Sequence, residues 1–188
     1  RDALPGVATP WDRQPIIDSI GGARQDQVRG AGGEPSVGFG PYHDLEKIAD
    51  TFRPFADNLL PAGTYTADWG NAAADDFQVT YVDGDFHQSG HGQGAGILIV
   101  DGDFTLSGSF VWYGAIIVLG EVAVVGGGGA KHVYGAVFVG DNVVELEEEE
   151  ESSEFTITGT SDIDYSSESE DALRRMHAYR VSYSAKLR

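Results

Sequence analysis

The sequence lacks cysteine altogether, which excludes a disulfide framework, a thiolate metal site and a thiol nucleophile. It is also poor in lysine: Lys47, Lys131 and Lys186 are the only lysines in a chain of 188 residues whose formal net charge is −18. So acidic a surface does not attract phosphate backbones or anionic lipids, and we expect no nucleic acid partner. No apolar run approaches the ~20 residues of a membrane-spanning helix, so the sequence predicts no membrane span.

Glycine, by contrast, is abundant, with 26 residues, and much of it belongs to a repeat. The pentapeptide VDGDF occurs at 82–86 and again at 100–104, and a degenerate copy follows at 118–122. A period of about 18 residues is too short for the common helical repeats, and it fits one coil of a parallel β-helix in which glycines mark the corners. The sequence therefore predicts a mainly β fold, a parallel β-helix solenoid with coils over residues 78–144, flanked by short α-helices.

The apolar residues of the repeat fall in unbroken clumps at 97–100, 115–118 and 136–139. Strict alternation marks a strand with one face in solvent, whereas unbroken clumps indicate strands that are buried on both faces. One face is then the core of the β-helix, and another element must cover the other. Residues 44–60 carry apolar side chains at helical spacing, so we expect an N-terminal helix that covers part of this outer face. Other side chains are expected to point into the core: Phe86, Phe104, Leu106, Val122 and Val124.

The remaining segments carry weaker signals. Residues 1–43 predict an extended or irregular N-terminal arm, and residues 44–188 predict one β-helix domain. The glutamate-rich run at 145–154 predicts a solvated acidic loop. Residues 169–187 predict a C-terminal helix, in which acids precede bases as the helix dipole favours, followed by an alternating strand.

The repeat region resembles a known group of proteins. Residues 79–141, which include GAGILIVDGDF and WYGAIIVLG, resemble the C-terminal region of PilX-type pilus assembly proteins, and SDIDYSSESEDAL at 161–173 is similar to a helix entry of that group. The resemblance implies an exported β-helical body in a type IV pilus system. The glycine corners also resemble, more weakly, those of bactofilin-like β-helical polymers, which would make the chain a cytoskeletal polymer.

Asp83, Asp85, Asp101 and Asp103 form a candidate metal site. In stacked coils these carboxylates lie about 4.8 Å apart, and they repel one another unless a cation lies between them. Calcium prefers oxygen ligands of this kind. The alternative interpretation is that aspartate flanks glycine because both residues favour turns.

Trp112, Tyr113 and Tyr134 are candidates for an aromatic strip that binds a sugar or a partner protein, and the alternative for them is core packing. The histidines do not supply the ligand number of a metal site, and the glycines at 126–129 lack the lysine and hydroxyl residue of a phosphate loop. No two acids stand at a separation that indicates catalysis. We therefore expect no catalytic residues and no enzyme activity, with a polysaccharide-active β-helix enzyme as the alternative.

Uncovered apolar residues and the open ends of a β-helix predict self-assembly, because both invite a second copy. The residues expected at the contacts are Ile16, Ile17, Ile20, Leu98, Ile116 and Val137. The sequence thus predicts a non-catalytic structural or adhesive protein of a pilus-like or extracellular filament, located outside the cell or on its surface. Its expected partners are further copies and pilus components, and calcium is the only candidate cofactor.

Overall fold

The computed structural model describes residues 4–9, 12–20, 22–39, 45–124, 129–140, 155–157 and 161–166. Its strands are β1 (Val7–Thr9), β2 (Val28–Arg29), β3 (Val37–Phe39), β4 (Asn58–Tyr65), β5 (Gln78–Gln88), β6 (His91–Val100), β7 (Phe104–Leu106), β8 (Ser109–Val118), β9 (Val122–Val124), β10 (Lys131–Val139), β11 (Phe155–Ile157) and β12 (Ser161–Asp164). Its helices are α1 (Gln14–Ser19) and α2 (Leu45–Phe52), with 3₁₀ turns η1 (Gly22–Gln27), η2 (Arg53–Phe55) and η3 (Ala72–Ala74).

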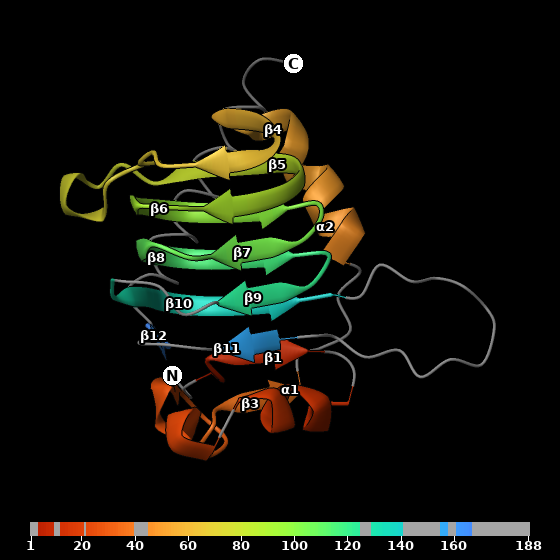
Figure 1. The fold of residues 1–188 in the computed structure, drawn as a ribbon. Helices are drawn as coiled ribbons and strands as arrows, with labels where there is room; N and C mark the ends of the chain where they lie inside the picture. The colour runs from red at the N-terminus through yellow and green to blue at the C-terminus, as the bar shows by residue number, and fades with distance from the viewer. Residues whose placement is uncertain are drawn as a thin grey trace.

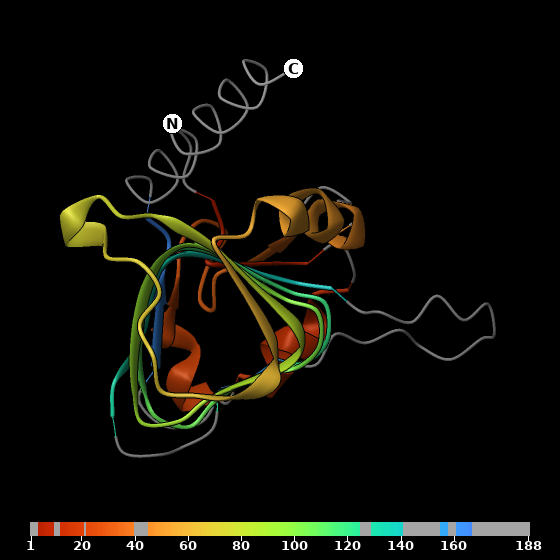
Figure 2. The same ribbon diagram turned by 90° about the horizontal axis from the view of Figure 1, so that it is seen from above.

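The strands wind into a parallel β-solenoid of about four turns, with few short helices. Figure 1 shows the turns stacked from β4, at what we call the upper end, to β3, at the lower end, and Figure 2 looks along the axis of the stack. The pairings between these strands are parallel, from β4–β5 at the upper end to β1–β3 at the lower end. The predicted fold class, mainly β with a parallel solenoid, is confirmed.

The period of the repeat varies along the stack. Val82 pairs with Val100 and Val100 with Val118, so the central coils keep the 18-residue offset that the sequence shows. Tyr113 pairs with Tyr134, which is 21 residues further on, and other turns are longer, so the average is about 21 residues per turn. The η3 loop, which lies between β4 and β5, projects from the stack in Figure 2.

Some of the repeated glycines lie within strands instead of at corners. Gly96 in β6 and Gly114 in β8 have φ values of +124° and +138°, which L side chains rarely adopt. A Cβ atom on Gly114 would lie 2.1 Å from the carbonyl oxygen of Gly96 in the next coil. These glycines therefore allow a long strand to bend around the solenoid while its neighbour stays at hydrogen-bonding distance.

The chain begins at the lower end and then crosses to the upper end. β1 pairs with β10 on one side and with β3 on the other, which places it in the stack below the coil of β10. α2 then runs along the outside of the stack (Figure 1), and the chain winds downward from β4 to β10. Where we expected an extended or irregular arm at 1–43, the described residues include the short strands β1, β2 and β3 and the helix α1. Strands of two or three residues are too short to show periodicity, and their partners come from distant segments: β1 pairs with β10, β3 with β1 and β2 with β12.

The inner core fills the solenoid with stacked apolar side chains. The Phe86 ring stacks on Phe104 with centroids 5.5 Å apart and on Tyr65 at 5.4 Å. Leu106 and Val122 are buried in the same cluster, as predicted, while the side chain of Val124 lies outside what the structure describes. Burial of each such side chain stabilises the fold by about 1.5–3 kcal/mol.

A second core lies outside the solenoid, beneath α2. Ala49 of α2 is buried against the outward side chains of one side of the stack, and Leu45, Ile48 and Phe52 pack against the same cluster. We call this surface the covered wall, and its buried members are Tyr81, Ile97, Ile99, Ile117 and Leu119. The clumped sequence pattern has its explanation here, because alternate residues of one strand enter two different cores.

The face assignment of three predicted assembly residues is corrected. Leu98, Ile116 and Val137 belong to the inner core and are buried, so they offer no surface to a second copy. Ile16 and Ile20 of the lower end are buried in that same cluster, and Ile17 packs against it. The apolar clumps did not indicate which residues face inward, because both sequence neighbours of each of these residues are apolar.

The predicted helix at 44–60 is shorter in the structure. α2 ends at Phe52, η2 follows, and Leu59 and Leu60 belong to β4, because parallel pairing with Tyr81 and Val82 outweighs their helical propensity. The predictions for 145–154 and 169–187, and for coil residues 141–144, lie outside the described residues.

Candidate functional site

Two of the four repeated aspartates, Asp85 and Asp103, each connect one coil to the next through a hydrogen bond, and we call these two contacts the aspartate brackets. The Asp85 Oδ1 atom accepts a hydrogen bond from the backbone N–H of Asp103 at 3.0 Å, and the Asp103 Oδ1 atom accepts one from the N–H of Glu121 at 2.9 Å. Each carboxylate thus satisfies a corner N–H of the coil below it. A Cβ atom on Gly102 or Gly120 would lie 2.6 or 2.4 Å from these same oxygens, which explains why glycine recurs beside the aspartate.

The other two aspartates, Asp83 and Asp101, bind Arg53 and Tyr81 beside the end of the covering helix. Arg53 of η2 forms an ion pair with Asp83, and its guanidinium lies 5.0 Å from the centre of the Tyr81 ring. The Tyr81 hydroxyl donates a hydrogen bond to Asp101 Oδ2 at 2.9 Å. Burial, and then this bond to Asp101, raises the pKa of Tyr81 to about 12. The guanidinium of Arg53 therefore provides the positive charge beside Asp83, where the sequence suggested a calcium ion.

The calcium site stays a prediction that this geometry does not favour. Each of the four carboxylates has a protein partner, as the turn interpretation expects. In the part of the chain that the structure describes, no group of three or more histidine, cysteine or acidic residues is placed to hold a metal ion. The histidines are also dispersed: His87 lies beside Ser107 Oγ at 2.7 Å, while His132 lies on another side of the stack.

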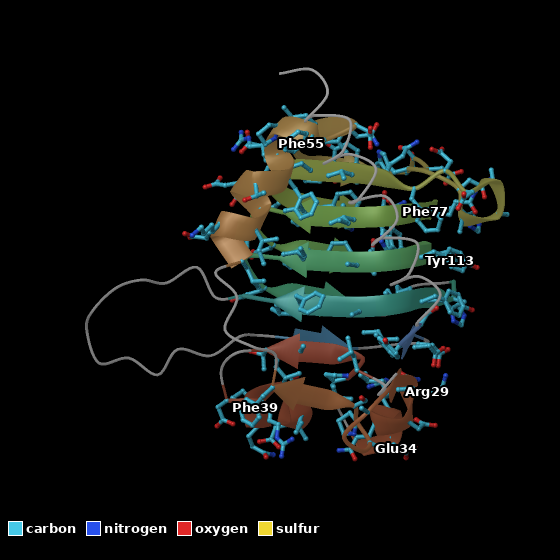
Figure 3. All side chains as sticks on the ribbon, turned by 180° about the vertical axis from the view of Figure 1, so that it is seen from behind. Arg29, Glu34, Phe39, Phe55, Phe77 and Tyr113 are labelled. Carbon is cyan, nitrogen blue, oxygen red and sulfur yellow. The ribbon has the colours of Figure 1, made fainter. Side chains whose placement is uncertain are left out.

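The structure divides the predicted aromatic strip. Trp112 is 0% exposed, and its Nε1 atom donates a hydrogen bond to the Gly96 carbonyl oxygen at 3.3 Å, so it is a core residue. Tyr113 and Tyr134 point outward, with ring centroids 4.9 Å apart and planes 16° apart. Tyr113 keeps 36% of its surface exposed and lies near the middle of the stack (Figure 3). The His132 ring lies parallel to Tyr134, 5.8 Å away between centroids.

An ionic cluster that the sequence did not reveal lies directly below these rings. The register pairs His132 with Asp162 and Tyr134 with Asp164, and the next strand places Arg29 beside Asp164. Arg29 donates hydrogen bonds to Asp162 at 2.9 Å and to Asp164 at 3.0 Å. The bond to Asp164 raises the pKa of Arg29. We call the whole surface the tyrosine wall, and its members are Tyr113, Tyr134, His132, Asp162, Asp164 and Arg29. Residues more than 130 positions apart meet here only because the N-terminal strands join the end of the solenoid.

The inner side of the same strands contains a buried cation. Lys131 is 2% exposed, points into the solenoid beside Phe110, and its Nζ atom has no hydrogen-bond partner among the described residues. Loss of hydration on burial lowers the pKa of Lys131. An amine without a partner in an apolar core is costly in its charged form, so this residue lowers the stability of the fold at neutral pH.

The two ends of the stack expose most of the remaining large apolar side chains. β4 pairs with β5 alone and β3 with β1 alone among the described strands, so each has one free edge. Leu59 of β4 is 58% exposed and Phe39 of β3 is 64% exposed. Figure 3 places Phe55 at the upper end and Phe39 at the lower end, with Tyr113 between them. Away from the two ends, Tyr113 is the exposed large apolar residue of the described side walls.

No helix in the described ranges has the length and hydropathy needed to cross a membrane. No protein-family model matches the chain, and no similar protein was found among curated proteins or solved structures.

Proposed function

We propose that this chain is a non-catalytic structural protein that stacks end to end, through β3 and β4, into an extracellular or cell-surface filament of a pilus-like system. The observation that carries the proposal is that each end has a free parallel edge, on β4 and on β3, bordered by an exposed apolar residue. An edge strand of this kind is a template for further pairing. Since the two edges differ, each copy binds the next head to tail, and such contacts generate open filaments.

The side walls of the stack support a scaffold function. Parallel pairing, a continuous inner core and the aspartate brackets join each coil to the next, so that a further copy extends an existing pattern. The net charge of −18 keeps the sides of neighbouring filaments apart through repulsion. The extracellular pilus-like setting rests on the sequence resemblance at 79–141.

The experiment measures molar mass by light scattering across a range of concentrations. We expect the wild-type mass to rise with concentration, and filaments to be visible by electron microscopy. Leu59→Lys blocks the upper end and Phe39→Lys the lower end, so each variant alone stays monomeric. An equimolar mixture restores one compatible pair of ends and yields dimers that grow no further.

Thr105→Lys is the matched control, since Thr105 lies in β7, in the middle of the stack, and the substitution adds the same charge away from the ends. This variant should assemble as the wild type does. A wild-type chain that stays monomeric at every concentration would contradict the proposal. Assembly of Leu59→Lys alone and of Phe39→Lys alone to the same extent as the wild type would also contradict the proposal.

A further inference from the structure

The tyrosine wall has a feature that end-to-end stacking does not use. Its two rings stack on each other, Tyr113 keeps 36% of its surface exposed, and neither hydroxyl has a hydrogen-bond partner among the described residues. In the coil above, the residue in register with Tyr113 is Ala95, which is 0% exposed. A partly exposed aromatic pair on the side of a solenoid is available to a partner.

Carboxylates lie on both sides of this pair along the solenoid axis. The exposed Asp68 accepts a hydrogen bond from the backbone N–H of Gln93, in the coil below it. From Gln93 the register runs down through Val111 and His132 to Asp162. Four strand spacings therefore separate Asp68 from Asp162, which is about 19 Å. An extended peptide of about six residues spans that distance, so the wall presents acid, aromatic rings and acid over the length of a short peptide.

Elsewhere the chain fills similar environments with its own arginines. On the covered wall, Arg53 lies over the Tyr81 ring and pairs with a neighbouring carboxylate. At the lower end, the Arg13 guanidinium lies 5.4 Å from the centre of the Phe39 ring. On the tyrosine wall, Arg29 binds the two carboxylates, but no guanidinium lies over either tyrosine ring in the described part of the chain.

We infer that the tyrosine wall binds an extended, arginine-bearing segment of a partner protein, which runs along the solenoid axis from Asp68 to Asp164. Each tyrosine ring covers one face of the other, so a guanidinium stacks on the remaining face of a ring and shares the carboxylates with Arg29 and Gln93. The net charge of −18 attracts a basic segment from a distance. The site lies on a side wall and does not include the free edge of β3 or of β4, so it is accessible on a single copy and on an assembled filament alike.

The test titrates the full-length chain into fluorescently labelled hexa-arginine at low salt and follows anisotropy. Tyr113→Leu with Tyr134→Leu removes the aromatic rings but leaves the charge of the protein unchanged. We expect this double variant to weaken binding about tenfold or more. Hexa-lysine of equal charge should bind the wild type several-fold more weakly than hexa-arginine, because an ammonium group does not stack.

Two further variants separate this site from general charge attraction and from unfolding. Asp164→Asn should weaken hexa-arginine binding, while His87→Ala, on another wall, should leave it unchanged; thermal melting verifies that each variant is folded. Equal binding of hexa-arginine by the wild type and the tyrosine double variant would overturn the inference, since net charge alone would then explain it. Binding of the neutral oligosaccharide cellohexaose, lost in the double variant and not displaced by hexa-arginine, would overturn it as well and assign the wall to a glycan.

Discussion

The covered wall and the tyrosine wall are two sides of the same solenoid, and they show how one strand pattern produces two kinds of surface. On the covered wall, the outward residues Ile99 and Ile117 are buried because α2 lies over them. On the tyrosine wall, the outward residues Tyr113 and Tyr134 stay partly exposed because the described chain places no helix over them. The inner residues of both walls share one core. The coils are alike on both walls, so the difference between a structural face and a binding face depends on whether a helix such as α2 covers the outward residues.

The largest expected effect distinguishes the two walls by truncation. Ile99→Ala removes a fully buried side chain from beneath α2 and should lower the free energy of unfolding by about 2–5 kcal/mol. Tyr113→Ala loses one ring stack at a partly exposed site and should cost about 0.5–1.5 kcal/mol. Urea denaturation of both variants measures the comparison. Equal losses would mean that the tyrosine wall is as important to folding as the covered wall.

The second prediction concerns Lys131, on the inner side of the tyrosine wall. Lys131→Met keeps the length of the side chain and removes the buried amine, so it should raise the free energy of unfolding at pH 7 by about 1–3 kcal/mol. Lys47→Met is the control, because Lys47 is exposed on α2 and its substitution removes the same charge from the protein. The control should produce no comparable gain in stability, and an equal gain would trace the effect to net charge.

The pH dependence of the comparison between wild type and Lys131→Met follows from the lowered pKa of Lys131. Between that lowered pKa and the ordinary value near 10.4, the unfolded chain binds a proton that the folded chain does not. Stability of the wild type then rises with pH, by at most about 1.4 kcal/mol per pH unit. The difference between the two proteins should therefore shrink as pH rises toward 10. A difference that is constant from pH 7 to pH 10 would show that the folded amine is not perturbed.

A third and smaller effect tests the brackets that connect the coils. Asp103→Ala leaves the N–H of Glu121 without its acceptor and should cost about 1 kcal/mol, whereas Asp103→Asn keeps an acceptor oxygen and should cost less. Thermal melting with and without a calcium chelator separates a bracket from a metal site. We expect the chelator to leave the wild-type melting temperature unchanged. A fall in that temperature, absent in Asp103→Ala, would restore the calcium interpretation.

The smallest expected effect sharpens the role of the cover. Arg53→Met removes an ion pair between partly exposed groups and the contact with the Tyr81 ring, which should cost about 0.5 kcal/mol. Hydrogen exchange should show the loss in α2 and η2, while the central coils keep their protection. Uniformly faster exchange across β6 and β8 would mean that the cover and the coils unfold together.

The central coils were predictable because their information is local. The repeated VDGDF and the glycine at 96, 114 and 135 established the register, and the structure pairs those residues as the alignment predicts. The clumps also indicated a second apolar environment and its cover. They could not indicate which residues of each clump face inward, because an inward and an outward residue are both apolar when both faces of the strand are buried. Leu98 and Ile116 were therefore assigned to the wrong face.

The candidate binding surface was only partly predictable. Tyr113 and Tyr134 were named from the sequence as part of a candidate aromatic strip with Trp112, and the structure pairs the two tyrosines while it places Trp112 in the core. Asp162, Asp164 and Arg29 were missed, since they lie in short strands outside the repeat and become neighbours through pairing between distant segments. The exposed apolar residues of β3 and β4 were missed for a similar reason, since their exposure depends on which strands end the stack.

The sequence by itself determined that successive coils stack in parallel, that glycine occupies the bends, and that the chain is strongly acidic. Those properties follow from spacing and composition, which act on neighbours in the chain or in the next coil. The tertiary structure alone decided that the N-terminal strands close the lower end, that α2 covers one wall, and that Arg29 reaches Asp162 and Asp164 beneath the tyrosines. These contacts join segments far apart in the chain, so the energy that selects them exists only once the coils have stacked.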